Sequence, residues 1–278
     1  MIIIDSDNYA AQGIETMFFP GGEPHVKVPK FKEDLLLHLK LRTWNDVGLA
    51  ACLCSALGHQ KAQYLSFIPY FPGARQDRSD GLAPFTLSIM TNLLYHRKTA
   101  IFDPHSDMLS RYIPFTAFMP VDVEVPSSAN DVVGIIAPDE GATLRAAQFL
   151  DRYHPEAELI QGYKERDPQT GKITNYALEI VRRKGTYIIV DDICDGGGTF
   201  NLTADHFHRQ DEAADCYLDM FVSHGIFSAG LAHITPRIRR IITTDSWCQP
   251  YRYWNAIDSG RLTVIPLLPA LLPRLEKI

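Results

Sequence analysis

The chain has 278 residues, of which 46% are hydrophobic and 22% charged, a composition typical of a globular protein with room for two domains. Its formal net charge of −6 argues against a broad nucleic-acid-binding surface, which requires an excess of basic residues. The start carries no basic leader and the apolar runs are short, so we expect neither a secretory signal nor a membrane span. Five cysteines without paired spacing favour a reducing, cytoplasmic setting.

Strands and helices are predicted to alternate along the first 122 residues. Apolar runs indicate strands, and apolar residues at helical spacing indicate helices. The predicted strands are 2–4, 35–41, 65–68 and 99–102, and the predicted helices are 44–57 and 84–95. Such alternation is typical of a parallel sheet flanked by helices.

The segment 18–23 contains a tight turn, with Phe19 just before the proline and glycines and Glu23 just after them. An aromatic ring and a carboxylate together can hold a nucleobase, by stacking and by accepting a hydrogen bond from an amino group. The same residues also fit an ordinary turn beside a hairpin strand at 25–28. The two interpretations are equally open on these residues alone.

A proline-rich turn after the strand at 65–68 leads into Arg75, Gln76, Asp77 and Arg78. Arginine side chains bind polyphosphate oxygens, and an amide or a carboxylate can bind a base or a ribose. A solvated cluster of charges is the alternative, and these residues by themselves favour it.

A second alternating series follows a segment at 114–128 that is rich in proline and small polar residues. This segment predicts a domain boundary, which we place between residues 122 and 123. The predicted strands of the second series are 132–137, 159–163, 187–190, 216–222, 241–244 and 262–267, and its predicted helices are 143–153 and 201–209.

The stretch 187–199, YIIVDDICDGGGT, carries the strongest functional signal. Three glycines before a helix leave backbone N–H groups unpaired, and the helix dipole adds positive character, so the turn suits a phosphate. The three acids are placed to accept hydrogen bonds from ribose-type hydroxyls or to hold a cation, at the sheet edge where open α/β sheets bind ligands. An ordinary surface turn would not require three acids. The candidate residues are Asp191, Asp192, Asp195, Gly196, Gly197, Gly198 and Thr199.

This loop resembles the motif that binds 5-phosphoribosyl-1-pyrophosphate (PRPP) in type I phosphoribosyltransferases and PRPP synthetases. The segment FIPYFPGARQDR at 67–78 resembles the ATP-binding segment of PRPP synthetases, which phosphoribosyltransferases generally lack. Other segments resemble the same family in the expected order. They are FFPGGE at 18–23, DPHS at 103–106, VVGIIAPDEGA at 132–142, KER at 164–166 and SHGIFS at 223–228.

The resemblance implies an α/β fold of two type I phosphoribosyltransferase-like domains, each a mainly parallel sheet flanked by helices. An N-terminal domain at 1–122 would bind ATP, and a C-terminal domain at 123–278 would bind ribose 5-phosphate and PRPP. The implied activity is transfer of the pyrophosphoryl group of ATP to the anomeric hydroxyl of ribose 5-phosphate, giving PRPP and AMP, with Mg²⁺ as cofactor. The resemblance also implies a homo-oligomer built from dimers, with hexamers among the forms of relatives.

The family pattern assigns roles residue by residue. Lys164 and Arg166 are implied as catalytic residues on a loop that closes over the transferring group, and His105 and Asp139 as magnesium contacts. The glycine loop is implied to bind ribose 5-phosphate. The implied ATP-binding residues are Phe19, Glu23, Arg75, Gln76, Asp77 and His105. Gly21 replaces an acidic residue that helps the family to read adenine, so we expect relaxed selectivity for the base.

Two other functions share parts of this pattern. A type I phosphoribosyltransferase would have the glycine loop but no use for the segment at 67–78. A non-catalytic regulatory subunit would have the same fold but would be expected to lack catalytic groups, whereas Lys164, Arg166 and His105 are all present.

Overall fold

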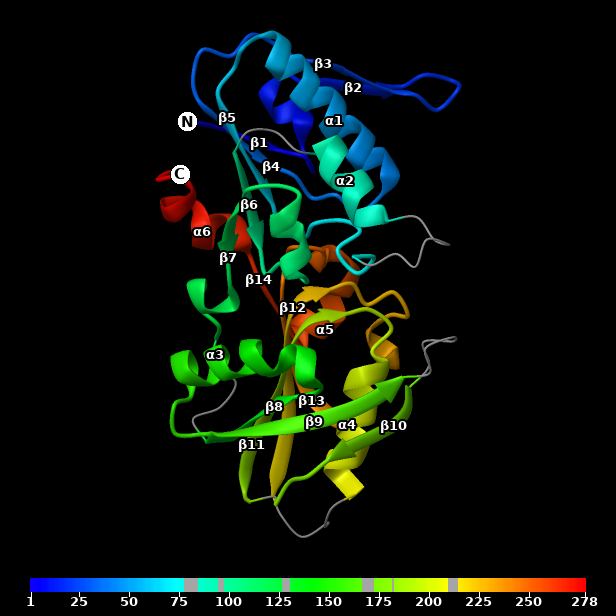
Figure 1. Ribbon diagram of the computed structural model, residues 1–278, viewed down its shortest axis with the longest axis vertical. Coiled ribbons are helices and arrows are strands. Elements are labelled where there is room, and N and C mark those ends of the chain that lie inside the picture. The colour runs from blue at the N-terminus through cyan, green and yellow to red at the C-terminus, as the bar shows by residue number, and fades with distance from the viewer. Residues whose placement is uncertain (78–84, 95–97, 127–130, 167–172, 182, 210–214) are drawn as a thin grey trace. The chain divides into compact units, whose positions relative to one another are not determined.

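The computed structural model describes residues 1–278 except 78–84, 95–97, 127–130, 167–172, 182 and 210–214 (Figure 1). The chain divides into two compact units, residues 1–119 with 268–278, called unit 1, and residues 120–267, called unit 2. Within the described residues, no helix is both long enough and apolar enough to cross a membrane.

Unit 1 contains a five-stranded parallel sheet in the order β1-β4-β5-β6-β7. Its strands are β1 (Ile2–Asp5), β4 (Leu35–His38), β5 (Tyr64–Ile68), β6 (Thr99–Phe102) and β7 (Thr116–Phe118). Every residue of β4 and β6 is buried, which explains why these strands are continuous apolar runs rather than alternating ones.

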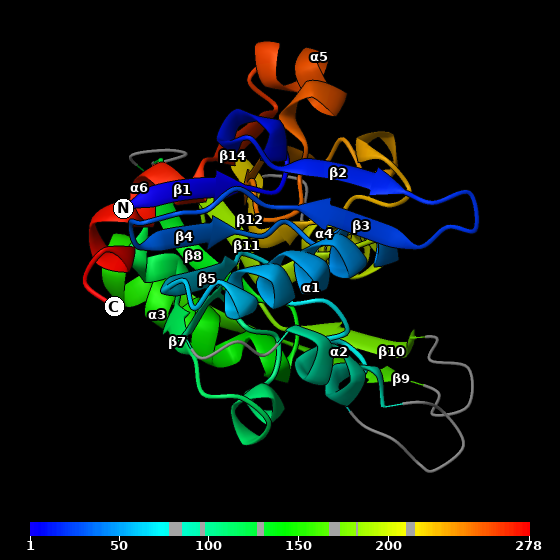
Figure 2. The same ribbon diagram turned by 90° about the horizontal axis from the view of Figure 1, so that it is seen from above.

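Helices α1 (Trp44–His59) and α2 (Thr86–Leu94) cover one face of this sheet (Figure 2). A capping box begins α1: Asp46 N donates to the Thr43 side chain at 3.2 Å, and Thr43 N donates to the Asp46 carboxylate at 2.7 Å. Leu53 of α1 and Met90 of α2 belong to the same buried core as the sheet residues that face them. The helical spacing of the apolar residues therefore predicts both helices correctly.

A strand and a helix that complete the main sheet and the C-terminus of unit 1 were not predicted from the sequence. β7 lies inside the segment at 114–128 that was interpreted as a boundary. Helix α6 (Leu267–Leu275) forms although it contains Pro273. Arg274 lies 5.3 Å from the centre of the Phe118 ring, and Lys98 Nζ donates to Ile278 O at 3.0 Å. Residues 268–278 thus pack in unit 1, which differs from the predicted domain division at 1–122 and 123–278.

Unit 2 contains a seven-stranded sheet in the order β10-β9-β8-β11-β12-β13-β14. All neighbouring strands are parallel except β9 and β10, which pair antiparallel. The strands are β8 (Val132–Ala137), β9 (Glu158–Arg166), β10 (Ile173–Leu178), β11 (Gly185–Cys194), β12 (Cys216–Gly225), β13 (Ile238–Thr244) and β14 (Leu262–Ile265).

Helices cover both faces of the sheet in unit 2. Ile188 and Val190 of β11 share a buried core with Phe149 of α3 (Thr143–Tyr153). Ile189, which points to the opposite face, shares a core with Phe207 of α4 (Gly198–Arg209). A short helix, α5 (Trp254–Asp258), follows β13. The predicted fold class, an α/β protein with two mainly parallel sheets flanked by helices, is confirmed.

Gly134 of β8 has no room for a side chain. A Cβ added there would lie 2.5 Å from Tyr187 Cδ1 and 2.8 Å from Ile160 Cδ1. We expect Gly134→Ala to lower the free energy of unfolding by about 1–3 kcal/mol through overpacking, as measured by urea denaturation. Gly58→Ala in α1 would meet nothing within 4 Å, so this control should be neutral or slightly stabilising. Equal destabilisation by both changes would contradict the packing argument.

Candidate functional site

Strand β11 extends beyond its predicted end and includes Asp191 and Asp192, which were expected in a loop. Strand alternation places Asp192 on the face covered by α3, together with Val190, and Asp191 on the face covered by α4. Asp192 is 6% exposed, and its backbone N–H donates to Asp191 Oδ1 at 2.9 Å. The two carboxylates therefore leave the strand at its carboxyl end, where the predicted site lies.

The glycine turn joins β11 to α4, whose first residue is Gly198. Gly197 has a φ of +81°, and a Cβ there would lie 2.4 Å from Ile234 Cδ1, so both the backbone and the close approach require glycine. Gly196 and Gly198 are exposed, with nothing within 4 Å of an added Cβ. The helix start is thus open to a ligand, and its N–H groups suit an anion.

Asn201 holds the segment that covers this turn. Its Nδ2 donates to His233 O at 2.7 Å, and its Oδ1 accepts from Thr235 N at 2.9 Å. Ile234, which lies between these two partners, is the residue that approaches Gly197. The sequence analysis did not select Asn201, because one polar residue in the first turn of a helix forms no recognisable pattern.

Asp139 and Lys164 meet beside the end of β8. Asp139 is the N-cap of a short 3-10 helix, and its Oδ1 accepts from Ala142 N at 3.1 Å. Its Oδ2 pairs with Lys164 Nζ on β9, and the two side chains are 16% and 17% exposed. Arg166 ends β9, but its side chain lies outside the described residues. The structure thus joins two residues that were predicted for separate roles.

A second cation, Arg145 of α3, lies among these acids. Its Nη2 is 3.8 Å from Asp192 Oδ2, and the two side chains are 11% and 9% exposed. Burial raises the pKa of Asp191 well above the usual aspartate value, and the carboxylates of Asp192 and Asp139 raise it further, while Arg145 opposes them. Three acids and two cations therefore gather at one sheet edge, as is common at functional sites. The sequence analysis missed Arg145, because a single arginine in a helix gives no local signal.

In unit 1, Phe19 and Glu23 lie at the tip of a hairpin formed by β2 (Glu15–Phe18) and β3 (Pro24–Lys27). Phe19 N donates to Glu23 O at 2.9 Å, and Gly22, with a φ of +92°, donates through its N–H to Phe19 O at 2.8 Å. The Phe19 side chain is 45% exposed. The hairpin structure of this segment is confirmed, and its role in binding a base stays a prediction.

The remaining predicted ATP-binding residues follow two adjacent strands of unit 1. Arg75, Gln76 and Asp77 lie in the turn after β5, where Gln76 N donates to Gly73 O at 2.9 Å. Arg75 and Gln76 are exposed and Asp77 is half-buried, while residue 78 lies outside the described part of the chain. His105 is exposed and follows β6. Because β5 and β6 are parallel neighbours, these residues leave the same edge of the sheet.

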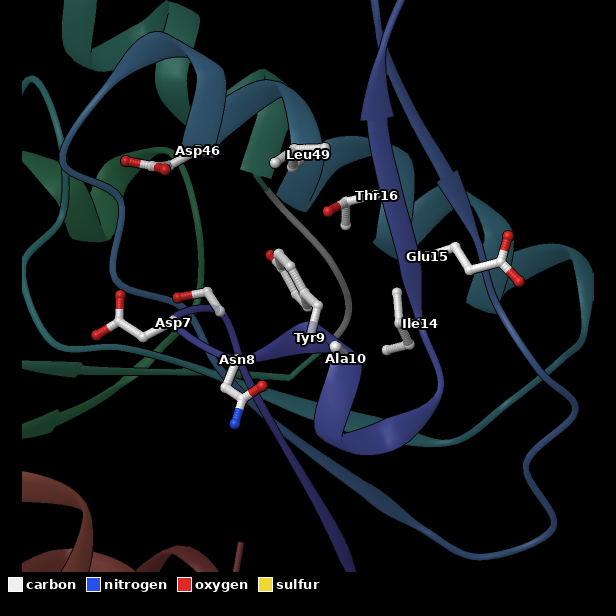
Figure 3. A pocket seen from close by; sticks show the side chains of 10 residues that line it. Asp7, Asn8, Tyr9, Ala10, Ile14, Glu15, Thr16, Asp46 and Leu49 are labelled. Carbon is white, nitrogen blue, oxygen red and sulfur yellow. The ribbon is translucent and has the colours of Figure 1, made fainter.

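A hollow of about 570 Å³ lies elsewhere in unit 1, beyond the end of β1 (Figure 3). Its lining includes Asp7, Glu15 and Asp46 and the ring of Tyr9. None of the predicted ATP-binding residues lines it. Three carboxylates would repel a triphosphate, so this hollow does not serve as the predicted ATP site.

The described residues contain no group of three or more histidine, cysteine, aspartate or glutamate side chains placed to hold a metal ion. Asp139 nevertheless fits magnesium, because this ion prefers oxygen ligands and often binds through one or two carboxylates plus substrate phosphates. The contact with Lys164 shows that this carboxylate already attracts a cation. The imidazole of His105 fits magnesium less well, since nitrogen ligands suit transition metals better.

Comparison with known proteins shows which family the chain is similar to. No family model matches the chain. The ribose-phosphate pyrophosphokinase of Maricaulis maris is 25% identical over 277 residues, covering 92% of this chain and 86% of that protein. Ribose-phosphate pyrophosphokinases of Sulfurisphaera tokodaii and Granulibacter bethesdensis are 26% and 28% identical, covering 93% and 75% of this chain and 90% and 69% of their own lengths. The chain is thus similar to ribose-phosphate pyrophosphokinases (PRPP synthetases) over most of its length.

The crystal structure of phosphoribosylpyrophosphate synthetase from Mycobacterium smegmatis matches this fold with a TM-score of 0.74. The match covers 99% of this chain and 98% of that one at 16% sequence identity. The similarity to these relatives agrees with the resemblance drawn from the motifs, and the structural match confirms the fold.

Asp191→Asn should remove a pH-dependent loss of stability. Because the pKa of Asp191 is higher in the folded state than in the unfolded state, wild-type stability falls as the pH rises through the interval between the two values. The asparagine variant has no such loss, so its advantage in free energy of unfolding should grow as the pH rises above the pKa of an unfolded aspartate, about 4. Denaturant unfolding at several pH values measures this difference. Asp151→Asn, at an exposed position of α3, is the control, and a pH-independent difference for Asp191→Asn would contradict the raised pKa.

Proposed function

We propose that the chain is a ribose-phosphate diphosphokinase that makes PRPP and AMP from ribose 5-phosphate and ATP. The observation that supports this most directly is the glycine turn at the start of α4, joined by three residues to the carboxylates of Asp191 and Asp192. The relatives at 25–28% identity are ribose-phosphate pyrophosphokinases by name. In this proposal the turn and the acids bind the two ends of ribose 5-phosphate.

The N–H groups at the start of α4 would bind the 5-phosphate, since the space beside Gly196 and Gly198 is open and this end of the helix carries the positive end of the dipole. The backbone of Gly196, Gly197 and Gly198 and the hydroxyl of Thr199 supply the donors. Asp191, Asp192 and Asp195 would accept hydrogen bonds from the ribose hydroxyls. A phosphate monoester on a polyol carries both kinds of group that this edge of the sheet can bind.

ATP would be bound by residues of unit 1. Arg75 offers a guanidinium to the phosphate chain, Gln76 and Asp77 offer hydrogen bonds, and Phe19 with Glu23 would hold the base. His105 would approach the phosphates. In unit 2, Asp139 would hold magnesium, which supplies positive charge when it is bound.

In the reaction, the anomeric oxygen of ribose 5-phosphate forms a bond to the β-phosphorus of ATP. The bond from that phosphorus to the oxygen bridging it to the α-phosphorus breaks, AMP leaves with the bridging oxygen, and the hydroxyl proton is lost to solvent. Positioning and charge stabilisation provide most of the catalysis in such transfers. Lys164 and Arg166 would stabilise the negative charge that develops on the transferred group.

A single assay tests the proposal. The protein is mixed with ATP and ribose 5-phosphate, with and without Mg²⁺, and AMP is quantified. We expect AMP only when both substrates and the metal are present. A phosphoribosyltransferase would release no AMP from this mixture, and neither would a non-catalytic subunit. Absence of AMP under all conditions would therefore overturn the proposal.

Lys164→Ala should reduce kcat by about 100-fold or more and change KM much less, because a donor that acts mainly in the transition state contributes little to substrate binding. Steady-state kinetics measure both constants. Lys184→Ala is the matched control, since this lysine is 80% exposed and pairs with a surface aspartate, Asp215, at 3.4 Å. An unchanged kcat in Lys164→Ala would remove this residue from the mechanism.

A further inference from the structure

The carbonyl groups just before the glycine turn are held by the turn that follows β12. Cys194 O accepts from Ile226 N at 2.9 Å and from Phe227 N at 3.0 Å. Asp195 O accepts from Ser228 N at 3.2 Å. The backbone that enters the glycine turn is therefore bound by three N–H groups of a neighbouring segment.

This neighbouring turn is strained and tightly packed. Phe227 has a φ of +50°, a left-handed conformation that is unfavourable for a non-glycine residue and persists only where the surroundings enforce it. Its side chain is 3% exposed and packs edge-on against Tyr253 at 5.9 Å between ring centres. A Cβ on Gly225 would lie 2.4 Å from the Phe227 ring and 2.8 Å from Thr243 Oγ1. The turn therefore has little freedom to move.

A buried network of polar side chains lies directly before the turn. His224, Ser246 and Thr244 are each at most 1% exposed. His224 Nδ1 is 2.8 Å from Ser246 Oγ, and Ser223 O accepts from Thr244 Oγ1 at 2.6 Å and from Ser246 Oγ at 3.1 Å. The network links the end of β12 to the residues at the end of β13.

These contacts are satisfied when the proton is assigned to His224 Nδ1, which then donates to Ser246 Oγ, and both hydroxyls donate to the two lone pairs of Ser223 O. Ser246 N donates to Thr244 Oγ1 at 3.2 Å. A buried network whose hydrogen bonds are all formed favours one arrangement of its side chains. Apolar side chains would fill the same space without fixing the orientation of the segments that they join.

We propose that Ser246 and His224 are positioning residues for the binding of a sugar phosphate. Through residues 226–228 they fix the carbonyls of Cys194 and Asp195, and so the orientation of the N–H groups that follow in the glycine turn. This rests on the proposed function, in which that turn binds the 5-phosphate. The ATP-binding residues proposed in unit 1 are not members of this network, so we expect its loss to affect the two substrates differently.

Ser246→Ala removes the group that accepts from His224. We expect its affinity for ribose 5-phosphate to fall about ten-fold by isothermal titration, with affinity for ATP unchanged. His224→Asn keeps a donor close to the position of Nδ1 and should bind ribose 5-phosphate nearly as well as wild type, whereas His224→Ala should not. This rescue by a conservative change distinguishes a directed hydrogen bond from simple filling of space.

Thr186→Val is the matched control, because it removes a buried hydroxyl at the opposite end of the same sheet, where Thr186 Oγ1 donates to Asp131 Oδ1 at 3.1 Å. It should leave the affinity for ribose 5-phosphate unchanged, even if urea denaturation shows lower stability. If Ser246→Ala does not fold, Thr244→Val removes one donor to Ser223 O and should weaken binding to a smaller extent.

The outcomes separate the two claims. If Ser246→Ala binds ribose 5-phosphate as tightly as the wild type, the positioning role is overturned. The same holds for Thr244→Val where it replaces that variant. In either case the proposed function still stands, because the wild type binds ribose 5-phosphate. An equal loss of affinity in Thr186→Val also overturns the positioning role, because the effect would then follow stability. Failure of the wild type to bind ribose 5-phosphate overturns both.

Discussion

Unit 2 depends on the burial of β11 on both faces. Because α3 covers one face and α4 the other, the strand must be apolar from Tyr187 to Val190, and polar groups can appear only where it reaches the edge of the sheet. The same burial makes ionisation of carboxylates at that edge costly. The site therefore lies at a boundary where a charged group is still accessible to a ligand but is no longer fully solvated.

Nearby cations stabilise some of the buried carboxylates at this edge more than others. Arg145 lies beside Asp192, and Lys164 pairs with Asp139. Two of the three buried carboxylates therefore have a neighbouring cation. Asp191 is the acid whose pKa rises well above the usual value, through burial and through its acidic neighbours. A ligand that brings hydroxyl donors or a cation to this edge would stabilise the ionised form of Asp191. Ribose hydroxyls and magnesium supply these two kinds of group.

The sequence predicts elements well where an apolar run is bounded by clear turn signals. The strands at 99–102 and 132–137 and the helix at 143–153 have the predicted bounds. β11 and β12 extend past their predicted ends, because strand pairing is a backbone interaction that continues through polar residues once the partner strand is present. β7 was missed because three residues in a proline-rich segment give no periodicity, and α6 because its prolines argue against a helix.

In the candidate site, too, residues within one continuous stretch are predicted from the sequence, whereas residues brought together by folding are not. The glycine turn and its acids form one continuous stretch, so residue types and spacing are enough to select them. Arg145 reaches the site only because α3 covers β11, and Ser246 meets His224 only because β12 pairs with β13. His224 and Ser246 are 22 positions apart, and no local pattern connects them. Residues that position a ligand-binding turn through other residues are thus found from the folded chain, whereas residues proposed to touch the ligand are found from the sequence.

The two units present different groups at the carboxyl edges of their sheets. Unit 2 has a glycine turn whose backbone N–H groups suit one compact phosphate. In unit 1 the predicted residues after β5 and β6 are side chains, with Arg75 and His105 both exposed. A long, permanently charged arginine side chain suits an extended phosphate chain better than a fixed backbone turn does, because it can reach along several phosphates. This contrast favours two phosphorylated substrates of different length, as a diphosphokinase requires, over the single phosphoribosyl donor of a phosphoribosyltransferase.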